Sequence, residues 1–122
     1  MNVLLLALSG AVGALARVLL DAAVTRRLRP RWPAGTAAVN VLGSLVLGVI
    51  TGLALRSGLP DPVRLALGTG FCGAFTTFST ASLEVVRLLE ERRGAAALAY
   101  AVGGLLASLG AAAAGLAVTG GL

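Results

Sequence analysis

Four long apolar runs, separated by short polar connections, constrain this chain more than any other feature. They cover approximately residues 3–24, 34–55, 63–89 and 95–118 of the 122-residue chain. A helix needs about 20 apolar residues to cross the hydrocarbon core of a bilayer, and each run reaches that length. We therefore expect an all-α integral membrane protein with four transmembrane helices, organised as a single domain over residues 1–122.

Composition supports the same class. Hydrophobic residues make up 57% of the chain and charged residues 12%, against about 25% charged in a soluble domain. All ten basic residues are Arg, and six of them lie in two short connections, at positions 26, 27, 29, 31, 92 and 93. Membrane topology explains this clustering better than nucleic acid binding does. Such short connections leave no room for an extramembrane domain, so we do not expect an enzyme.

The third apolar run is interrupted by a stretch rich in glycine, hydroxyl and phenylalanine side chains, Gly70–Thr80. Lipid cannot form hydrogen bonds with backbone groups, so irregular backbone at membrane depth is tolerated only beside protein or water. Such interruptions commonly form the ion site of transport proteins. We expect the third helix to be broken near its middle.

Polar side chains inside the runs are candidates for an ion pathway. Asn40 lies deep in the second run, where a buried amide is costly without partners. Two interpretations stay open for it, namely a hydrogen bond between helices and a donor that lines a pore. Amide and hydroxyl donors suit an anion. The full set is Arg17, Asn40, Thr76, Thr77, Ser79, Thr80, Glu84, Tyr100 and Ser108.

The third run adds an aromatic element to this set. Thr76, Thr80 and Glu84 follow one another at four-residue intervals, which predicts a shared helical face, and Phe75 and Phe78 flank it. The edge of an aromatic ring carries partial positive charge, so it can face a small anion without binding it too tightly. Packing in the protein core is the alternative role for these rings.

The same segment resembles the third helix of the Fluc/CrcB fluoride channels, whose hallmark is Gly-Gly-x-Thr-Thr-Phe-Ser-Thr-Phe. Residues 73–81 read Gly-Ala-Phe-Thr-Thr-Phe-Ser-Thr-Ala. Residues 10–17 are similar to the glycine-rich first helix of the family with its Arg. Residues 35–43 resemble the Gly-Thr-x-x-x-Asn-x-x-Gly of the second helix, and Tyr100 matches the aromatic on the fourth.

The resemblance implies an antiparallel dimer of four-helix subunits in the cell membrane, from a family with dual topology. Fluoride would pass along pores at the dimer interface, and this passive export would relieve fluoride toxicity. A central, structural Na⁺ would be held by backbone carbonyls, here those of Gly73 and Thr76. Arg17 would be a structural polar residue. The fluoride pathway would comprise Asn40, Phe75, Phe78, Ser79, Thr80, Glu84, Tyr100 and Ser108.

Two positions depart from the family pattern. Ala81 stands where the second phenylalanine belongs, and Gly104 where the fourth helix usually carries a hydroxyl. Phe75 cannot simply replace the missing ring, because it lies on the other side of Phe78. A homodimer of this chain would therefore have two impaired pores.

The distribution of Arg bears on the same point. Seven Arg residues lie on one side of the predicted membrane, at positions 26, 27, 29, 31, 87, 92 and 93, and two on the other, at 56 and 64. The positive-inside rule predicts one orientation, with both termini outside. An antiparallel homodimer needs nearly balanced charge, so we expect a heterodimer with a paralogous subunit.

Two alternative functions are compatible with four short helices. One is a non-conducting structural subunit that completes the pore of a partner. The other is a small multidrug-type antiporter, which needs an embedded carboxylate on the first helix. That helix offers only Asp21, near its end.

Overall fold

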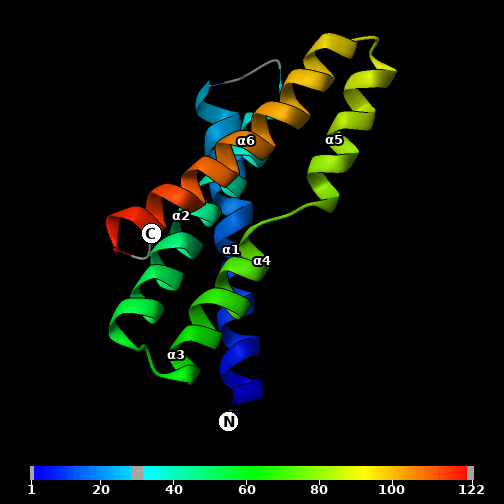
Figure 1. Ribbon diagram of the computed structural model, residues 1–122. Coiled ribbons are helices and arrows are strands. Elements are labelled where there is room, and N and C mark those ends of the chain that lie inside the picture. The colour runs from blue at the N-terminus through cyan, green and yellow to red at the C-terminus, as the bar shows by residue number, and fades with distance from the viewer. Residues whose placement is uncertain (1, 29–31, 121–122) are drawn as a thin grey trace.

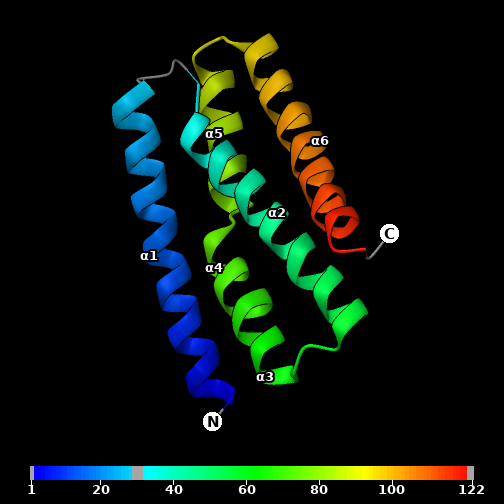
Figure 2. The same cartoon turned by 90° about the vertical axis from the view of Figure 1, so that its left-hand side faces the viewer.

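The computed structural model describes residues 2–28 and 32–120, and every element in them is helical. Three helices, α1 (Asn2–Leu28), α2 (Ala34–Ser57) and α6 (Gly94–Val118), are long and apolar enough to cross a membrane. Their bounds lie within a few residues of three of the predicted spans, which confirms a long apolar helix at each of these places (Figures 1 and 2). Arg29 and Arg31, which contribute to the predicted charge bias, lie outside the described residues.

The third predicted span is divided into pieces. It starts with α3 (Asp61–Arg64), continues as the π-helix η1 (Leu65–Cys72) and ends its first half with α4 (Gly73–Phe75). Residues 76–78 are not helical, and α5 (Ser79–Glu90) forms the second half. The predicted break in the third helix is thus confirmed.

The two halves of this span have different neighbours. η1 and α4 pack against α1, whereas α5 packs against α6. Figure 1 shows α5 leaving the line of α4 and running beside α6. A cluster of buried side chains, Leu88, Ala97 and Tyr100, joins α5 to α6. The break therefore lets one span contact both sides of the subunit.

Glycines bring α2 and α6 into direct backbone contact. A Cβ added at Gly48 would meet the carbonyl of Ala112. One added at Gly115 would lie 2.6 Å from the carbonyl oxygen of Leu45 and 2.7 Å from the amide nitrogen of Val49. Small residues allow such close approach between helices in lipid, where packing stabilises association. These contacts hold the two helices that flank the candidate site.

α1 and η1 are joined in the same manner. A Cβ at Gly13 would meet the backbone of Phe71, and one at Gly70 would meet the Ser9 hydroxyl. Phe71 in turn stacks on Phe75, with ring centroids 5.4 Å apart, and Phe75 is almost fully buried. The first half of the third span is therefore closely packed up to the point where it breaks.

Candidate functional site

The break at residues 76–78 is held by a side chain from another helix. Asn40, in α2, donates from Nδ2 to the carbonyl oxygen of Thr77 and accepts from the Thr77 N–H at Oδ1, both at 2.8 Å. One amide thus satisfies both backbone groups of the residue at the centre of the break. This is how the chain meets the requirement that backbone groups at membrane depth be hydrogen-bonded within the protein.

Local hydroxyl groups complete the break. Thr76 is extended (φ −83°, ψ 159°), and its hydroxyl donates to the carbonyl of Cys72 at 2.9 Å, at the end of η1. The hydroxyl of Thr77 accepts the N–H of Thr80 at 3.1 Å, in the first turn of α5. Hydroxyls in such positions satisfy the otherwise unpaired N–H groups at the start of a helix. The Thr-Thr pair therefore both ends one helix and begins the next.

These bonds free two carbonyl oxygens. In an unbroken helix the N–H of Thr77 would bond to the carbonyl of Gly73, but here it donates to Asn40. The N–H of Thr80 would bond to the carbonyl of Thr76, but here it donates to the Thr77 hydroxyl. Both carbonyl oxygens have thus lost their usual helical donor, and oxygens of this kind are suitable ligands for a hard cation.

A groove of about 550 Å³ lies beside the break, between α2, α5 and α6. It brings together predicted pathway residues from three separate spans, together with both positions that depart from the family pattern. The groove also includes Thr76, one of the two predicted cation ligands. These residues are Asn40, Thr76, Phe78, Ala81, Tyr100, Gly104 and Ser108.

Three residues that line the groove leave a ring, a hydroxyl group or an open space without a neighbour in this subunit. Phe78 is 87% exposed and projects from the surface of the subunit. The hydroxyl of Tyr100 is buried and has no hydrogen-bond partner among the described residues. Gly104 has open space where a side chain would begin. The groove therefore combines polar donors with room that this chain does not fill.

Other predicted pathway residues lie outside the groove. Phe75 is buried against Phe71, and Ser79 and Thr80 occupy the first turn of α5 without lining the groove. The prediction that Thr76 shares a helical face with Thr80 and Glu84 is wrong. The non-helical residues between Thr76 and α5 destroy the four-residue register.

Two further predicted residues also lie away from the groove. Gly73 is exposed in α4, and a Cβ there would contact nothing. Arg17 is half-buried in α1, away from the groove lining. Their predicted roles, as a cation ligand through the carbonyl and as a structural polar residue, stay predictions.

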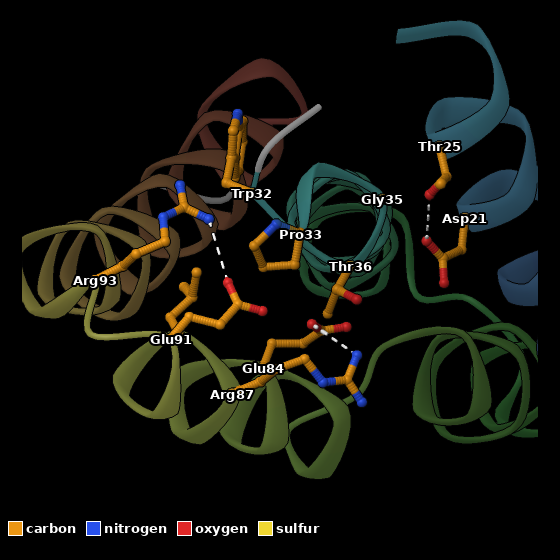
Figure 3. A pocket seen from close by; sticks show the side chains of 11 residues that line it. Asp21, Thr25, Trp32, Pro33, Gly35, Thr36, Glu84, Arg87, Glu91 and Arg93 are labelled. Atoms are coloured by element: carbon orange, nitrogen blue, oxygen red, sulfur yellow. Dashed lines mark hydrogen bonds and ion pairs between the residues drawn. The ribbon is translucent and has the colours of Figure 1, made fainter. Parts of the chain in front are cut away.

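Glu84 belongs to a second, charged pocket of about 280 Å³ (Figure 3). This pocket lies where the end of α1, the start of α2 and the end of α5 meet. Trp32, which lines it, packs edge-on against Tyr100 of the groove, with ring centroids 6.4 Å apart. The two cavities are thus neighbours, with this aromatic pair between them.

Sequence reasoning missed this second pocket. It is built from residues far apart in the chain, including Asp21, Thr36, Glu84, Arg87 and Glu91. Only the intramembrane position of Glu84 gave a signal for it. Among the described residues there is no cluster of three or more Cys, His, Asp or Glu side chains that could hold a metal ion.

Comparisons with known proteins agree with the resemblance. Residues 4–116 match the family described as CrcB-like protein, Camphor Resistance (CrcB). A protein of Leifsonia xyli named Fluoride-specific ion channel FluC 1 is 52% identical over 93% of this chain and 83% of its own length. Nitrobacter winogradskyi has a Fluoride-specific ion channel FluC that is 43% identical over 93% of this chain and 91% of its own. A FluC 1 of Streptomyces avermitilis is 47% identical over 95% and 94% of the two chains. This multi-pass membrane protein therefore belongs to the CrcB/FluC family of fluoride-specific ion channels.

Proposed function

We propose that this chain is one subunit of a fluoride channel that exports fluoride passively across the cell membrane. The observation that carries the proposal is the groove, in which donors from α2 and α6 meet Phe78 of the broken third span. The names of the relatives point to the same ion. Membership of this family leaves the multidrug antiporter alternative without support.

The groove has the chemistry that an anion needs. The Asn40 amide uses one of its two N–H donors on Thr77 and keeps the other. Ser108 adds a second donor, on α6, whereas the Tyr100 hydroxyl is buried, so it is the ring of Tyr100 that lines the groove. The exposed ring of Phe78 can present its positive edge. Four other predicted pathway residues do not line the groove, so any contact they make with fluoride would lie outside it: Phe75, Ser79, Thr80 and Glu84.

A second subunit would complete the site. Phe78 and Ser79 are exposed at the break, and lipid does not tolerate exposed irregular backbone at membrane depth. A groove of about 550 Å³ is also far larger than one dehydrated anion. Side chains of an antiparallel partner would cover the break and narrow the groove until an ion must lose its water.

We propose that the partner is a paralogue rather than a second copy. Ala81 and Gly104, which lack the usual ring and hydroxyl, face the same groove, so the defect in this chain is concentrated in one place. The Arg bias favours one orientation for this chain, with termini outside. Relatives named FluC 1 and FluC 2 fit species that carry more than one such chain.

A structural Na⁺ fits the freed carbonyl oxygens of Gly73 and Thr76. One pair from each of two subunits would supply four oxygen ligands, and the ion would stabilise the break rather than take part in conduction. Arg17, the half-buried charge of α1, would act as a structural polar residue. The support for this site is that the two N–H groups that would bond to these carbonyls in a regular helix, those of Thr77 and Thr80, donate to other groups.

Fluoride efflux from liposomes tests the proposal. We would compare this chain alone with this chain co-purified with a paralogue that carries the second phenylalanine. Efflux from the pair, with little from this chain alone, is the expected result. Absence of efflux from both preparations would contradict channel function, whereas equal efflux would contradict only the heterodimer.

A second candidate is a non-conducting subunit that completes the pore of its partner. The observations that favour it are Ala81 and the open space at Gly104. Replacing Asn40 or Phe78 in the heterodimer separates the two functions. Unchanged efflux in both variants would mean that conduction uses the residues of the partner.

A further inference from the structure

Trp32 connects the two cavities of the subunit. It lines the charged pocket, and its ring lies edge-on to the ring of Tyr100, with centroids 6.4 Å apart at an angle of 65°. Tyr100 in turn lines the groove. In Figure 3 the indole ring lies on the side of Pro33 away from Glu84. Trp32 therefore contacts the wall of the groove, although it is not one of the residues that line it.

A tight turn holds the backbone of Trp32. Trp32 precedes Pro33, and proline restricts the conformation of the residue before it. Pro33 has φ −75° and ψ 66°, and the N–H of Ala34 donates to the carbonyl oxygen of Trp32 at 2.7 Å. These are the dihedral angles and the hydrogen bond of an inverse γ-turn. The Trp-Pro sequence therefore fixes the point from which the indole ring projects, at the start of α2.

The ring of Tyr100 has few other contacts that could fix its orientation. Its hydroxyl is buried without a hydrogen-bond partner among the described residues, and in that part of the chain no second ring contacts it. The cluster to which it belongs includes Leu88 and Val85. The other members of the cluster are small side chains from three helices, namely Ala37, Ala81, Ala96 and Ala97.

The two departures from the family pattern leave this ring with still less support. Ala81 packs against the cluster of Tyr100 at the position where the family hallmark has a ring. Gly104, one turn further along α6, has open space where a side chain would begin. Both residues line the groove together with Tyr100. In this chain the edge-on contact with Trp32 is therefore the main constraint on the orientation of the Tyr100 ring.

We propose that Trp32 is a positioning residue for fluoride conduction, because it fixes the ring of Tyr100 in the wall of the groove. Edge-to-face pairs of aromatic rings have a preferred geometry, and they contribute beyond the area that they bury. Held in this way, the Tyr100 ring gives its end of the groove a constant width. The inference rests on the proposed function, since it takes the groove as the pathway of the ion.

Fluorine NMR of the complete channel tests whether Trp32 fixes the ring. Tyr100 is the only Tyr of the chain, so 3-fluorotyrosine labels this ring alone in the subunit. A ring that turns slowly gives two resonances, one for each orientation of the fluorine, whereas a ring that turns rapidly gives one averaged resonance. We expect two resonances in the unmodified chain, one in Trp32→Ala, and two again in Trp32→Phe. Trp32 is 49% exposed, so its replacement should leave the fold intact. Leu98→Ala, at a 66% exposed position of α6, is the control and should keep two resonances.

Fluoride efflux from liposomes tests the link to conduction. In the complete channel, Trp32→Ala should lower fluoride efflux by about two- to tenfold, the factor that corresponds to one aromatic pair. The ratio of fluoride to chloride efflux should fall as well, and Trp32→Phe should restore most of both. In a Tyr100→Ala background the replacement of Trp32 should have no further effect, because the ring that it positions is absent.

Several outcomes would overturn the proposal. One averaged resonance in the unmodified chain, or two in Trp32→Ala, would show that Trp32 does not fix the ring and only anchors the subunit at the membrane–water interface, where Trp is enriched. A freed ring with unchanged efflux would show that its orientation is irrelevant to conduction, and faster efflux would show that Trp32 obstructs the pathway. An unmodified channel that exports no fluoride would instead contradict the proposed function, and the NMR comparison would still decide whether Trp32 fixes Tyr100.

Discussion

The side-chain amide of Asn40 forms hydrogen bonds with both backbone groups of Thr77, each at 2.8 Å. The third span is thus interrupted at Thr77, and a side chain of α2 provides the hydrogen bonds that the interrupted helix lacks. Of the two interpretations of Asn40, the structure shows the hydrogen bond between helices. Asn40 also lines the groove, and its role as a donor in a pore stays a prediction.

Removing the Asn40 amide should destabilise the subunit. We expect Asn40→Leu to cost about 2–4 kcal/mol in the free energy of unfolding, because two hydrogen bonds are lost and both backbone groups of the half-buried Thr77 are left without partners. Ser44→Ala, one turn further along α2 in the same groove, should change it by less than about 0.5 kcal/mol. Unfolding in mixed detergent micelles measures both. Equal stability of the two variants would mean that the break does not depend on Asn40.

The two phenylalanines at the break should behave in opposite ways. Phe75 is 4% exposed, so Phe75→Ala should cost about 3–5 kcal/mol in the free energy of unfolding. Phe78 is 87% exposed in the subunit, so Phe78→Ala should leave the stability of the subunit nearly unchanged and lower fluoride efflux of the complete channel. A Phe78→Ala variant that folds normally but exports less fluoride would support a role for this ring in the pathway. A large loss of subunit stability there would contradict its placement.

Glycines of α6 should differ according to what they face. Gly115→Ala places a methyl group against the backbone of Leu45 and Val49, so it should destabilise the fold by about 1–3 kcal/mol. Gly110 faces open space on the same helix, so Gly110→Ala should be neutral or stabilising by up to about 1 kcal/mol. Thermal unfolding of the two variants, side by side, measures the difference.

Restoring the two missing groups tests the heterodimer directly. Gly104→Ser enters open space, and Ala81→Phe enters the groove, so both should fold. We expect the double variant to conduct fluoride without a paralogue, or with less dependence on it, in the liposome efflux assay. Folding without any gain in efflux would show that the defect of this chain lies elsewhere.

The orientation of the subunit can be read from cysteine labelling, since Cys72 is buried and easily removed. In a Cys72→Ala background, Ser57→Cys should react with an impermeant maleimide on intact cells, and Glu90→Cys should react only after lysis. This follows from the Arg bias, which puts the connection beside Glu90 inside. Equal labelling of both positions would indicate two orientations in the membrane.

Much of the fold could be predicted from hydropathy. The long helices follow from apolar run length, which does not depend on distant contacts. The position of the break follows from the Gly-Thr-Phe composition, but its partner Asn40 comes from a distant part of the chain and could not be assigned from that composition. The π-helical turn at Leu65–Cys72 could not be predicted, since i→i+5 bonding leaves no distinct pattern in such a uniformly apolar run.

The residues that the family motif selects lie closer together than those selected by spacing alone. Asn40, Phe78, Tyr100 and Ser108 line one groove, and their part in a fluoride pathway stays a prediction. Glu84 does not line it, because the change in direction at the break turns α5 toward the charged pocket. A four-residue spacing predicts a common face only within one continuous helix.

The Asn40–Thr77 bonds also have a consequence for the order of membrane assembly. The third span is broken because a group from α2 replaces helical hydrogen bonds, and an isolated segment in lipid has no such group. Before α2 docks, the third span is therefore most stable as one uninterrupted helix. The break must form late, as the spans come together, and the subunit acquires the groove beside it only when its tertiary structure is complete.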